Sequence, residues 1–234
     1  MLLIAHRGAS GYAPENTMAA FRLALEMGAK AIELDVHQTK DNELVVIHDD
    51  DLKRVGRRKG RVKDMTYEEL SKADIGSWFD PCFSNERVPR LADVYELTLG
   101  KCELHVELKA GSKLYPGIEE RVAALVEHRK AWQTTLISSF DHTALFNVRA
   151  LETRARLGYL LGLTGMKRAF QEMEALRAES LNMSTRQADA KRVKDAKAHG
   201  LRTLVYTVNT RKELGRLDRL AVDGVFTNFP ELTT

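Results

Sequence analysis

The chain of 234 residues is 44% hydrophobic and 29% charged, and its formal net charge is +3. A chain of this length and balance can bury a sizeable core and is typical of a globular protein. So small a net charge gives no sign of nucleic-acid binding. No apolar run approaches the roughly 20 residues of a membrane-spanning helix, so no membrane span is expected.

The two cysteines, Cys82 and Cys102, are too few for a disulfide framework and lack the spacing of a metal site. We expect two free thiols, which fits a reducing compartment. Met1 leads directly into a short apolar run, without the basic and long apolar regions of a secretory signal. A cytoplasmic location is therefore expected, whereas the sequence leaves the oligomeric state open.

Short β-rich runs alternate along the chain with longer stretches whose apolar residues recur at spacings of three and four. The predicted strands cover residues 2–6, 31–36, 103–108, 134–138, 156–161, 180–183, 202–208 and 224–227. The predicted helices cover residues 15–28, 91–99, 117–130, 141–151, 167–178, 187–199 and 210–220. Eight strands separated by helices favour a (β/α)8 barrel that forms one domain over residues 1–234. A doubly wound open sheet is the main alternative, but no G-x-G-x-x-G motif follows any strand.

The run at 43–48 is a ninth strand candidate. The connection to it from the strand at 31–36 is too short for a parallel crossover, so we expect an antiparallel hairpin turned at Asp41 and Asn42. This pairing carries His48 to a place beside the second strand. The next segment, about 49–90, includes the basic stretch KRVGRRKGRVK and has no strand-helix rhythm. It is interpreted as an insertion over the barrel mouth, with a solvated charged loop as the alternative.

Two of the predicted strands carry charged residues on one face. Side chains alternate along a strand, so in AIELDVH and in ELHVELK the apolar residues share one face and the polar residues the other. The polar faces carry Glu33, Asp35 and His37 on the first strand, and His105, Glu107 and Lys109 on the second. In an alternating α/β fold, both faces of each strand are buried. A solvent-exposed edge strand therefore does not explain charged faces on two strands. Both strands are expected to aim carboxylates into the barrel near their C-terminal ends.

Grouped in a site poor in water, Glu33, Asp35 and Glu107 would repel one another unless they are protonated or hold a cation. Carboxylate oxygens as the only ligands favour Mg²⁺ or Ca²⁺ over zinc. The sequence does not distinguish these two ions, because both accept carboxylate oxygens.

Positive charge and two histidines accompany the carboxylates. Lys109 supplies a cation and Arg7 a planar fork, which together suit a phosphate oxyanion. His6 and His48 end strands at the same mouth and are candidates for proton transfer at neutral pH.

In order and spacing, these residues resemble the motifs of the glycerophosphodiester phosphodiesterases, especially the short bacterial cytoplasmic type. The motifs are HRG at 6–8, PENT at 14–17, ELD at 33–35, HDD at 48–50, VELK at 106–109, SSF at 138–140 and VYTVN at 205–209. The GSWF stretch of the insertion is also similar. Each motif is weak alone, but the ordered set is specific and runs over nearly the whole chain.

The resemblance implies a phosphodiesterase-type (β/α)8 barrel and assigns a role to each candidate residue. One divalent cation, Mg²⁺ or Ca²⁺, would be held by Glu33, Asp35 and Glu107. His6 and His48 would be the general acid and base, and Arg7 and Lys109 would bind the phosphate. Tyr206 stands where many members carry tryptophan, and would form a smaller apolar wall against the glycerol.

The resemblance also implies a substrate and a route. Members cleave small glycerophosphodiesters, such as glycerophosphocholine and glycerophosphoethanolamine, to sn-glycerol 3-phosphate and an alcohol. No serine, threonine or cysteine of the motifs pairs with a histidine as a protein nucleophile would. The family favours attack by the glycerol 2-hydroxyl, which gives a cyclic phosphate that water then opens.

Two other functions fit the same residues. A phospholipase D-like enzyme acting on lysophospholipids would need a wider apolar entrance, and a metal-dependent phosphate-ester binder would need no catalysis. A nucleic-acid partner would depend on KRVGRRKGRVK alone, where no aromatic residues are interleaved.

Tyr206 in place of tryptophan and a short C-terminal tail depart from the family pattern. Alternation puts Tyr206 and Asn209 on opposite faces, so only Tyr206 is assigned to the pocket. The tail NFPELTT is too short for a full eighth helix, so we expect barrel closure to depend on that tail or on a partner chain.

Overall fold

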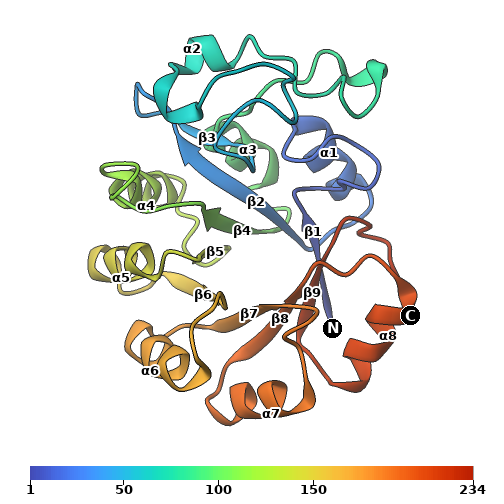
Figure 1. Ribbon diagram of the computed structural model, residues 1–234, viewed down its shortest axis with the longest axis vertical. Helices are drawn as coiled ribbons and strands as arrows, with labels where there is room; N and C mark the ends of the chain where they lie inside the picture. Colours follow the sequence, from blue (N-terminus) through green and yellow to red (C-terminus); the bar gives the residue numbers. More distant parts are fainter. Residues whose placement is uncertain (234) are drawn as a thin grey trace.

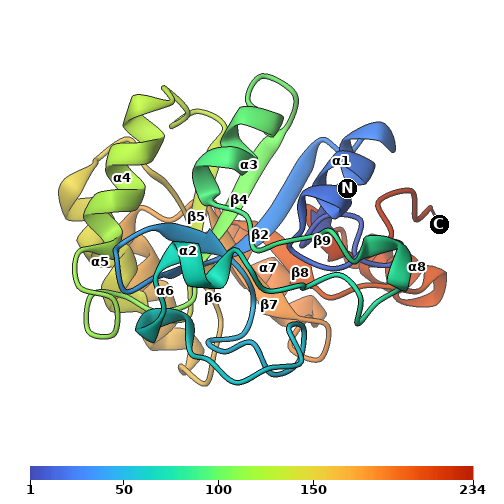
Figure 2. The same ribbon diagram turned by 90° about the horizontal axis from the view of Figure 1, so that it is seen from above.

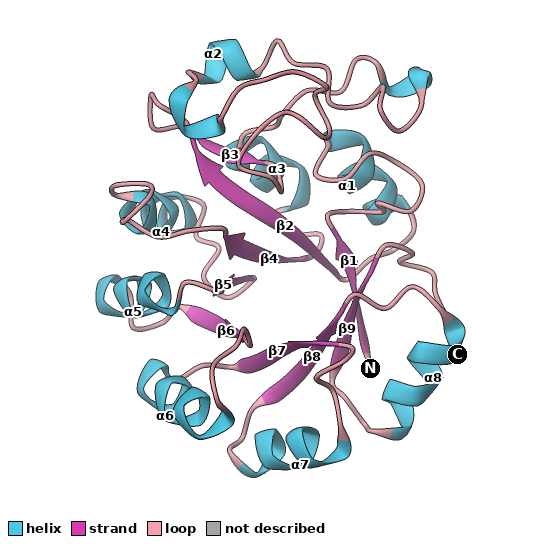
Figure 3. Ribbon diagram, in the orientation of Figure 1, coloured by secondary structure: helices cyan, strands magenta, loops and turns pink. Residues whose placement is uncertain are grey.

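In the computed structural model, which describes residues 1–233, eight parallel strands form a closed ring surrounded by helices (Figures 1 and 3). Around the ring the strands are β1 (Leu2–His6), β2 (Ala31–Gln38), β4 (Glu103–Leu108), β5 (Thr135–Ser139), β6 (Arg156–Leu160), β7 (Ser180–Ser184), β8 (Arg202–Tyr206) and β9 (Gly224–Thr227). The fold is therefore the (β/α)8 barrel that the strand-helix alternation predicts, and not an open sheet.

Helices cover the outside of the ring. They are α1 (Met18–Glu26), α3 (Leu91–Thr98), α4 (Ile118–His128), α5 (His142–Leu151), α6 (Met166–Leu176), α7 (Ala190–Ala198) and α8 (Arg211–Arg219). Their apolar residues pack on the outward side chains of the strands, among them Ile32, Leu34 and Val36, which are fully buried. Burying a side chain of this kind contributes about 1.5–3 kcal/mol, so this outer layer is the main core of the molecule.

The ring closes by strand pairing within the chain. β9 lies parallel to β1, with Leu2 opposite Gly224 and Ala5 opposite Thr227. The expectation that closure depends on the tail or on a partner chain is therefore wrong. The tail instead packs on the turn after β1, where the Phe229 ring lies edge-on to Tyr12 with ring centroids 5.4 Å apart.

The interior of the ring is packed around a small buried cluster of Ile4, Ala31, Leu204 and Phe226. At the end where the strands begin, Arg156 and Arg202 both pair with Glu179, at 2.7 and 2.9 Å. The opposite end, where the strands finish, is left for other side chains, and it is the end at which barrel enzymes carry their sites.

A hairpin and a long segment interrupt the alternation after β2. β3 (Leu44–Val46) pairs antiparallel with β2, with Val36 opposite Val46, as the short connection predicts. The segment 47–90 contains α2 (Tyr67–Leu70) and lies beside β2, β3 and α1 (Figures 1 and 2). With β3 it encloses an apolar cluster of its own, made by Val45, Ile47, Leu52, Val55, Val62, Met65, Leu70, Ala73, Ile75 and Val88. The segment is therefore more than a solvated charged loop.

Among residues 1–233, no helix is both long and apolar enough to cross a lipid bilayer.

Candidate active site

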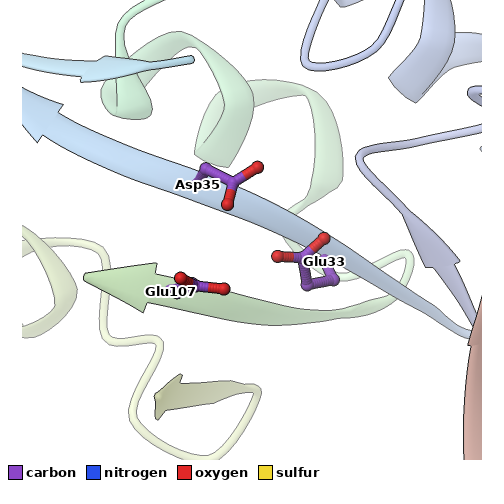
Figure 4. A group of neighbouring side chains, drawn as sticks. All are labelled: Glu33, Asp35 and Glu107. Atoms are coloured by element: carbon purple, nitrogen blue, oxygen red, sulfur yellow. The ribbon is translucent and has the colours of Figure 1, made fainter. Parts of the chain in front are cut away.

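Three carboxylates converge inside the barrel where β2 and β4 run side by side (Figure 4). Glu33 and Asp35 share the inner face of β2, and the register places Glu107 of β4 directly beside Asp35. One oxygen from each lies within 4.8 Å of the others. Glu33 and Asp35 are only 5% and 1% exposed. The alternation read from the sequence therefore brings this triad together.

The three carboxylates of the triad have pKa values that are shifted in different directions. Burial and the charge of Asp35 raise the pKa values of both Glu33 and Glu107. For Asp35, burial opposes ionisation, but Arg7 and Lys109 outweigh it and lower the pKa to about 2. A divalent cation among the three oxygens would remove the repulsion that disfavours ionisation of the two glutamates. The donor set consists of oxygens only and fits a hard ion such as Mg²⁺ or Ca²⁺.

Two cationic side chains flank the triad. Arg7 Nε lies 3.1 Å from Asp35 Oδ2, and Lys109 Nζ lies 2.9 Å from Glu107 Oε1 and 3.2 Å from Asp35 Oδ1. Asn16 donates from Nδ2 to Asp35 Oδ2 at 2.8 Å. Asp35 is thus held on both oxygens, which fixes the centre of the group.

His6 is the last residue of β1 and faces the same space. Its Nδ1 lies 2.8 Å from Asn228 Oδ1, and its Nε2 lies 4.0 Å from Glu33 Oε2. Because an amide oxygen only accepts, Nδ1 carries the hydrogen and Nε2 is left with a free lone pair. Burial and the charge of Arg7 lower the pKa of His6 to about 4.

His48 follows β3, which pairs with the same edge of β2 as β1 does. Ile47 N donates to Asp35 O at 3.0 Å, and this bond holds the end of the hairpin beside the triad. The Nδ1 atom of His48 lies 2.7 Å from Asp49 Oδ1. The carboxylate accepts the Nδ1 hydrogen, so Nε2 is again the free nitrogen.

A cavity of about 160 Å³ opens between these residues and the opposite strands. One wall is made by His6, Arg7, Glu33, His48, Glu107 and Lys109. The other wall includes Ser138, Phe140, Leu160, Asn182, Tyr206 and Phe226. Seven of the eight predicted site residues line the cavity; the eighth, Asp35, lies buried behind its wall. Asn209 does not line it and instead accepts from Asn228 N at 2.9 Å, as the alternation predicts.

Two inward histidines do not belong to the cavity. His37 Nδ1 lies 2.6 Å from the Tyr115 hydroxyl, and its Nε2 lies 3.0 Å from His48 O. His37 thus braces the backbone at His48. His105 is fully buried beside Phe226, and neither of its ring nitrogens has a hydrogen-bond partner among residues 1–233. Burial lowers the pKa of His105 to about 3.

Several residues that shape the site were not singled out from the sequence. Asn16 lies inside the PENT motif, so a signal for it existed. Asn228 follows the last strand and carries no local signal, because its role depends on closure of the ring 222 positions away from His6.

The triad suits a divalent cation, the flanking cations suit a phosphate, and the free histidine nitrogens suit proton exchange. These groups lie where the strands of a (β/α)8 barrel end. Fold and site together define a class, the barrel enzymes that act on phosphate esters.

Comparison with known proteins narrows this class. The model of the glycerophosphoryl diester phosphodiesterase family matches residues 6–232. A glycerophosphodiester phosphodiesterase of Caldanaerobacter subterraneus subsp. tengcongensis is 39% identical over 231 residues, which cover 98% of this chain and 95% of that relative. The chain belongs to the glycerophosphoryl diester phosphodiesterase family, a family of hydrolases.

Solved structures agree with this membership. An Oleispira antarctica phosphodiesterase, in complex with the product sn-glycerol-3-phosphate, superimposes with a TM-score of 0.87 at 31% identity, over 98% of this chain and 94% of that one. A glycerophosphodiester phosphodiesterase of Agrobacterium tumefaciens superimposes with a TM-score of 0.85 at 30% identity, over 99% and 97%.

Proposed function

We propose that this protein hydrolyses glycerophosphodiesters, such as glycerophosphocholine and glycerophosphoethanolamine, to sn-glycerol 3-phosphate and an alcohol. The observation that carries the proposal is the convergence of two histidines, each with a free Nε2, on a cavity beside three carboxylates whose oxygens lie within 4.8 Å of one another. The Oleispira antarctica relative is in complex with sn-glycerol-3-phosphate, which supports this choice of product. We also propose that the enzyme works in the cytoplasm.

Glu33, Asp35 and Glu107 would hold one divalent cation, Mg²⁺ or Ca²⁺. When bound, such an ion lowers the pKa of a coordinated hydroxyl and neutralises charge on a phosphate. Arg7 and Lys109 line the cavity next to the triad and would bind the remaining phosphate oxygens. Tyr206 lies on the opposite wall, where its ring would pack against the glycerol carbons.

His6 and His48 would divide the proton transfers between them. One histidine, neutral and with a bare Nε2, takes the proton of the attacking hydroxyl. The other, which enters the step with hydrogens on both ring nitrogens, gives its Nε2 proton to the departing alcohol oxygen. The Nδ1 partners, Asn228 and Asp49, hold each ring in the orientation that presents Nε2. Proton transfer of this kind contributes about 10²- to 10⁴-fold in rate.

The attacking group is assigned to the substrate. Ser138 lines the cavity, but no hydrogen bond joins its hydroxyl to either histidine within the described chain. The glycerol 2-hydroxyl would attack phosphorus and expel the alcohol, which forms a five-membered cyclic phosphate that water then opens. This makes the first step intramolecular, for which effective molarities reach about 10⁵ M or more.

The test is release of glycerol 3-phosphate from glycerophosphocholine, measured with a coupled dehydrogenase. We expect cleavage of glycerophosphocholine, and at least a hundredfold slower turnover of the analogue that lacks the glycerol 2-hydroxyl. Comparable turnover of the two would mean that water attacks directly. Release of choline from lysophosphatidylcholine in place of glycerophosphocholine would favour the phospholipase D-like alternative.

A further inference from the structure

A chain of ion pairs connects Arg7 and His48, two residues of the same cavity wall, through the inserted segment 47–90. Arg54 donates from both terminal nitrogens to Glu15, at 2.9 and 2.8 Å, and from Nε to Asp49 Oδ2 at 2.7 Å. Asp49 in turn accepts from His48 Nδ1 at 2.7 Å. Glu15 accepts from an Arg7 terminal nitrogen at 2.8 Å. One guanidinium therefore fixes two carboxylates, and each carboxylate fixes a different group of the cavity.

The network is partly withdrawn from water. The side chain of Glu15 is 15% exposed and that of Asp49 is 28% exposed, whereas the side chain of Arg54 is 41% exposed. The Arg54 guanidinium lies 5.9 Å from the centroid of the Trp78 ring, which covers it from within the insertion. Burial opposes ionisation of both carboxylates, but hydrogen bonds from Arg54 outweigh it and lower the pKa values of Glu15 and Asp49. Both carboxylates are thus ionised acceptors at neutral pH.

We propose that Arg54 is a positioning residue that orients His48 through Asp49 and Arg7 through Glu15. A planar guanidinium that makes three charge-assisted hydrogen bonds restricts both carboxylates in direction as well as in distance. Arg54 itself lies outside the cavity lining, so it acts only through these neighbours. The assignment of His48 to proton transfer rests on the proposed function, but the orientation of its ring does not.

The same contacts are poorly suited to a purely structural role. Ion pairs with exposed partners contribute little to folding stability. The insertion already encloses an apolar cluster, and Glu86 anchors it to the barrel a second time by accepting from Ala19 N at 3.2 Å. Loss of Arg54 should therefore change the geometry of the site more than the stability of the fold.

The experiment compares Arg54→Gln and Arg54→Lys with the native protein. We expect Arg54→Gln to lower kcat about ten- to a hundredfold, by analogy with the loss that follows removal of a group that orients a metal-ligating histidine. Lysine restores the charge but cannot bridge two carboxylates, so Arg54→Lys should recover only a small part of the loss.

A spectroscopic readout separates positioning from stability. Nitrogen-15 NMR at about pH 8, where an ordinary histidine is neutral, reports which imidazole nitrogen carries the hydrogen. In the native protein the spectrum should show the His48 hydrogen on Nδ1. The His48 signal is identified as the one that is missing from the spectrum of His48→Ala. Arg54→Gln should give a mixture of the two tautomers. This measurement needs no substrate, so it stands even if glycerophosphodiesters are not cleaved.

Two matched variants serve as controls. Arg58→Gln removes an arginine of the same loop whose side chain makes no ion pair within residues 1–233, and Glu86→Ala removes the second anchor of the insertion. Both should keep native kcat within about threefold and leave the His48 tautomer unchanged.

The double variant Arg54→Gln with Asp49→Ala should lose less than the product of the two single losses, since both substitutions act on His48. The proposal is overturned if Arg54→Gln keeps native kcat and the native tautomer. It is also overturned if Glu86→Ala reproduces the losses of Arg54→Gln. Should Arg54→Gln fail to fold, Glu15→Gln and Asp49→Asn take its place with the same two readouts.

Discussion

At the scale of single residues, the two histidines of the cavity differ in the partner that holds them. Nδ1 of His6 faces the neutral amide of Asn228, whereas Nδ1 of His48 faces the carboxylate of Asp49. In both rings the nitrogen that remains free is Nε2. The site therefore offers two proton-exchanging atoms whose orientations are fixed independently, one by the segment after β9 and one by the insertion.

We predict that His6→Ala and His48→Ala each reduce turnover of glycerophosphocholine by about two to four orders of magnitude. Both side chains are partly exposed to the cavity, so their removal should leave the fold intact. His128→Ala, on an exposed position of α4, is the control and should be close to native. A nearly native rate in either cavity variant, with circular dichroism unchanged, would exclude that histidine from the reaction.

The sequence was enough to place the three carboxylates, but not the loop residues that hold the rest of the site. Side chains alternate along a strand and parallel neighbours keep register, so Glu33, Asp35 and Glu107 could be placed on one face without a structure. The residues that orient Arg7, His48 and His6 come from loops, whose direction no periodicity records. Glu15, Asp49 and Asn228 are of this kind.

At the scale of elements, the turn from β1 into α1 shows local sequence serving the site. The predicted helix at 15–28 begins at Met18, because Thr17 is its N-cap and accepts from Ala20 N at 3.2 Å. Asn16 adopts a φ of +56° and points its amide at Asp35. The spacing of apolar residues therefore overestimates the length of this helix. Residues before Met18 form the turn instead, where Asn16 binds Asp35.

Gly8 lies in the same turn, packed against the backbone of Ala20. It has a φ of +83°, and a Cβ there would lie 2.7 Å from the backbone carbon of Ala20. Gly28, at the other end of α1, has a φ of +79° but nothing within 4 Å of such a Cβ. The two glycines share a left-handed backbone conformation, but only Gly8 has neighbouring atoms that an added Cβ would meet.

We predict that Gly28→Ala costs about 1–2 kcal/mol of unfolding free energy, from backbone strain alone. Gly8→Ala adds a clash with backbone and should cost about 1–3 kcal/mol more. Urea unfolding of both variants measures the difference. Equal losses would show that the close packing of α1 on this turn is not a constraint.

At the scale of the whole molecule, charged residues gather at both ends of the barrel, with an apolar cluster in its interior. Glu33, Glu107 and Lys109 line the cavity where the strands finish, whereas Arg156 and Arg202 begin their strands and pair with Glu179. Strand-helix alternation was enough to predict the ring. The apolar cluster of the insertion was not predictable, because its residues follow no regular period and meet only when β3 and the segment 47–90 fold together. We propose that this insertion and the barrel form one domain over residues 1–234.

A bound cation should stabilise the fold as well as support cleavage. Glu33 and Glu107 have raised pKa values because burial and Asp35 disfavour their ionisation, so a bound divalent ion would stabilise the folded chain relative to the unfolded one. At a hundred times its dissociation constant the ion contributes about 2.7 kcal/mol, which corresponds to roughly 5–10 °C in Tm for a chain of this size. Removing it with EDTA should lower Tm by this amount and abolish cleavage, and Mg²⁺ or Ca²⁺ should restore both. Glu107→Gln, which removes one ligand charge, should leave Tm much less sensitive to chelation. Full activity in excess EDTA, after dialysis confirmed as metal-free, would contradict the assigned ligands.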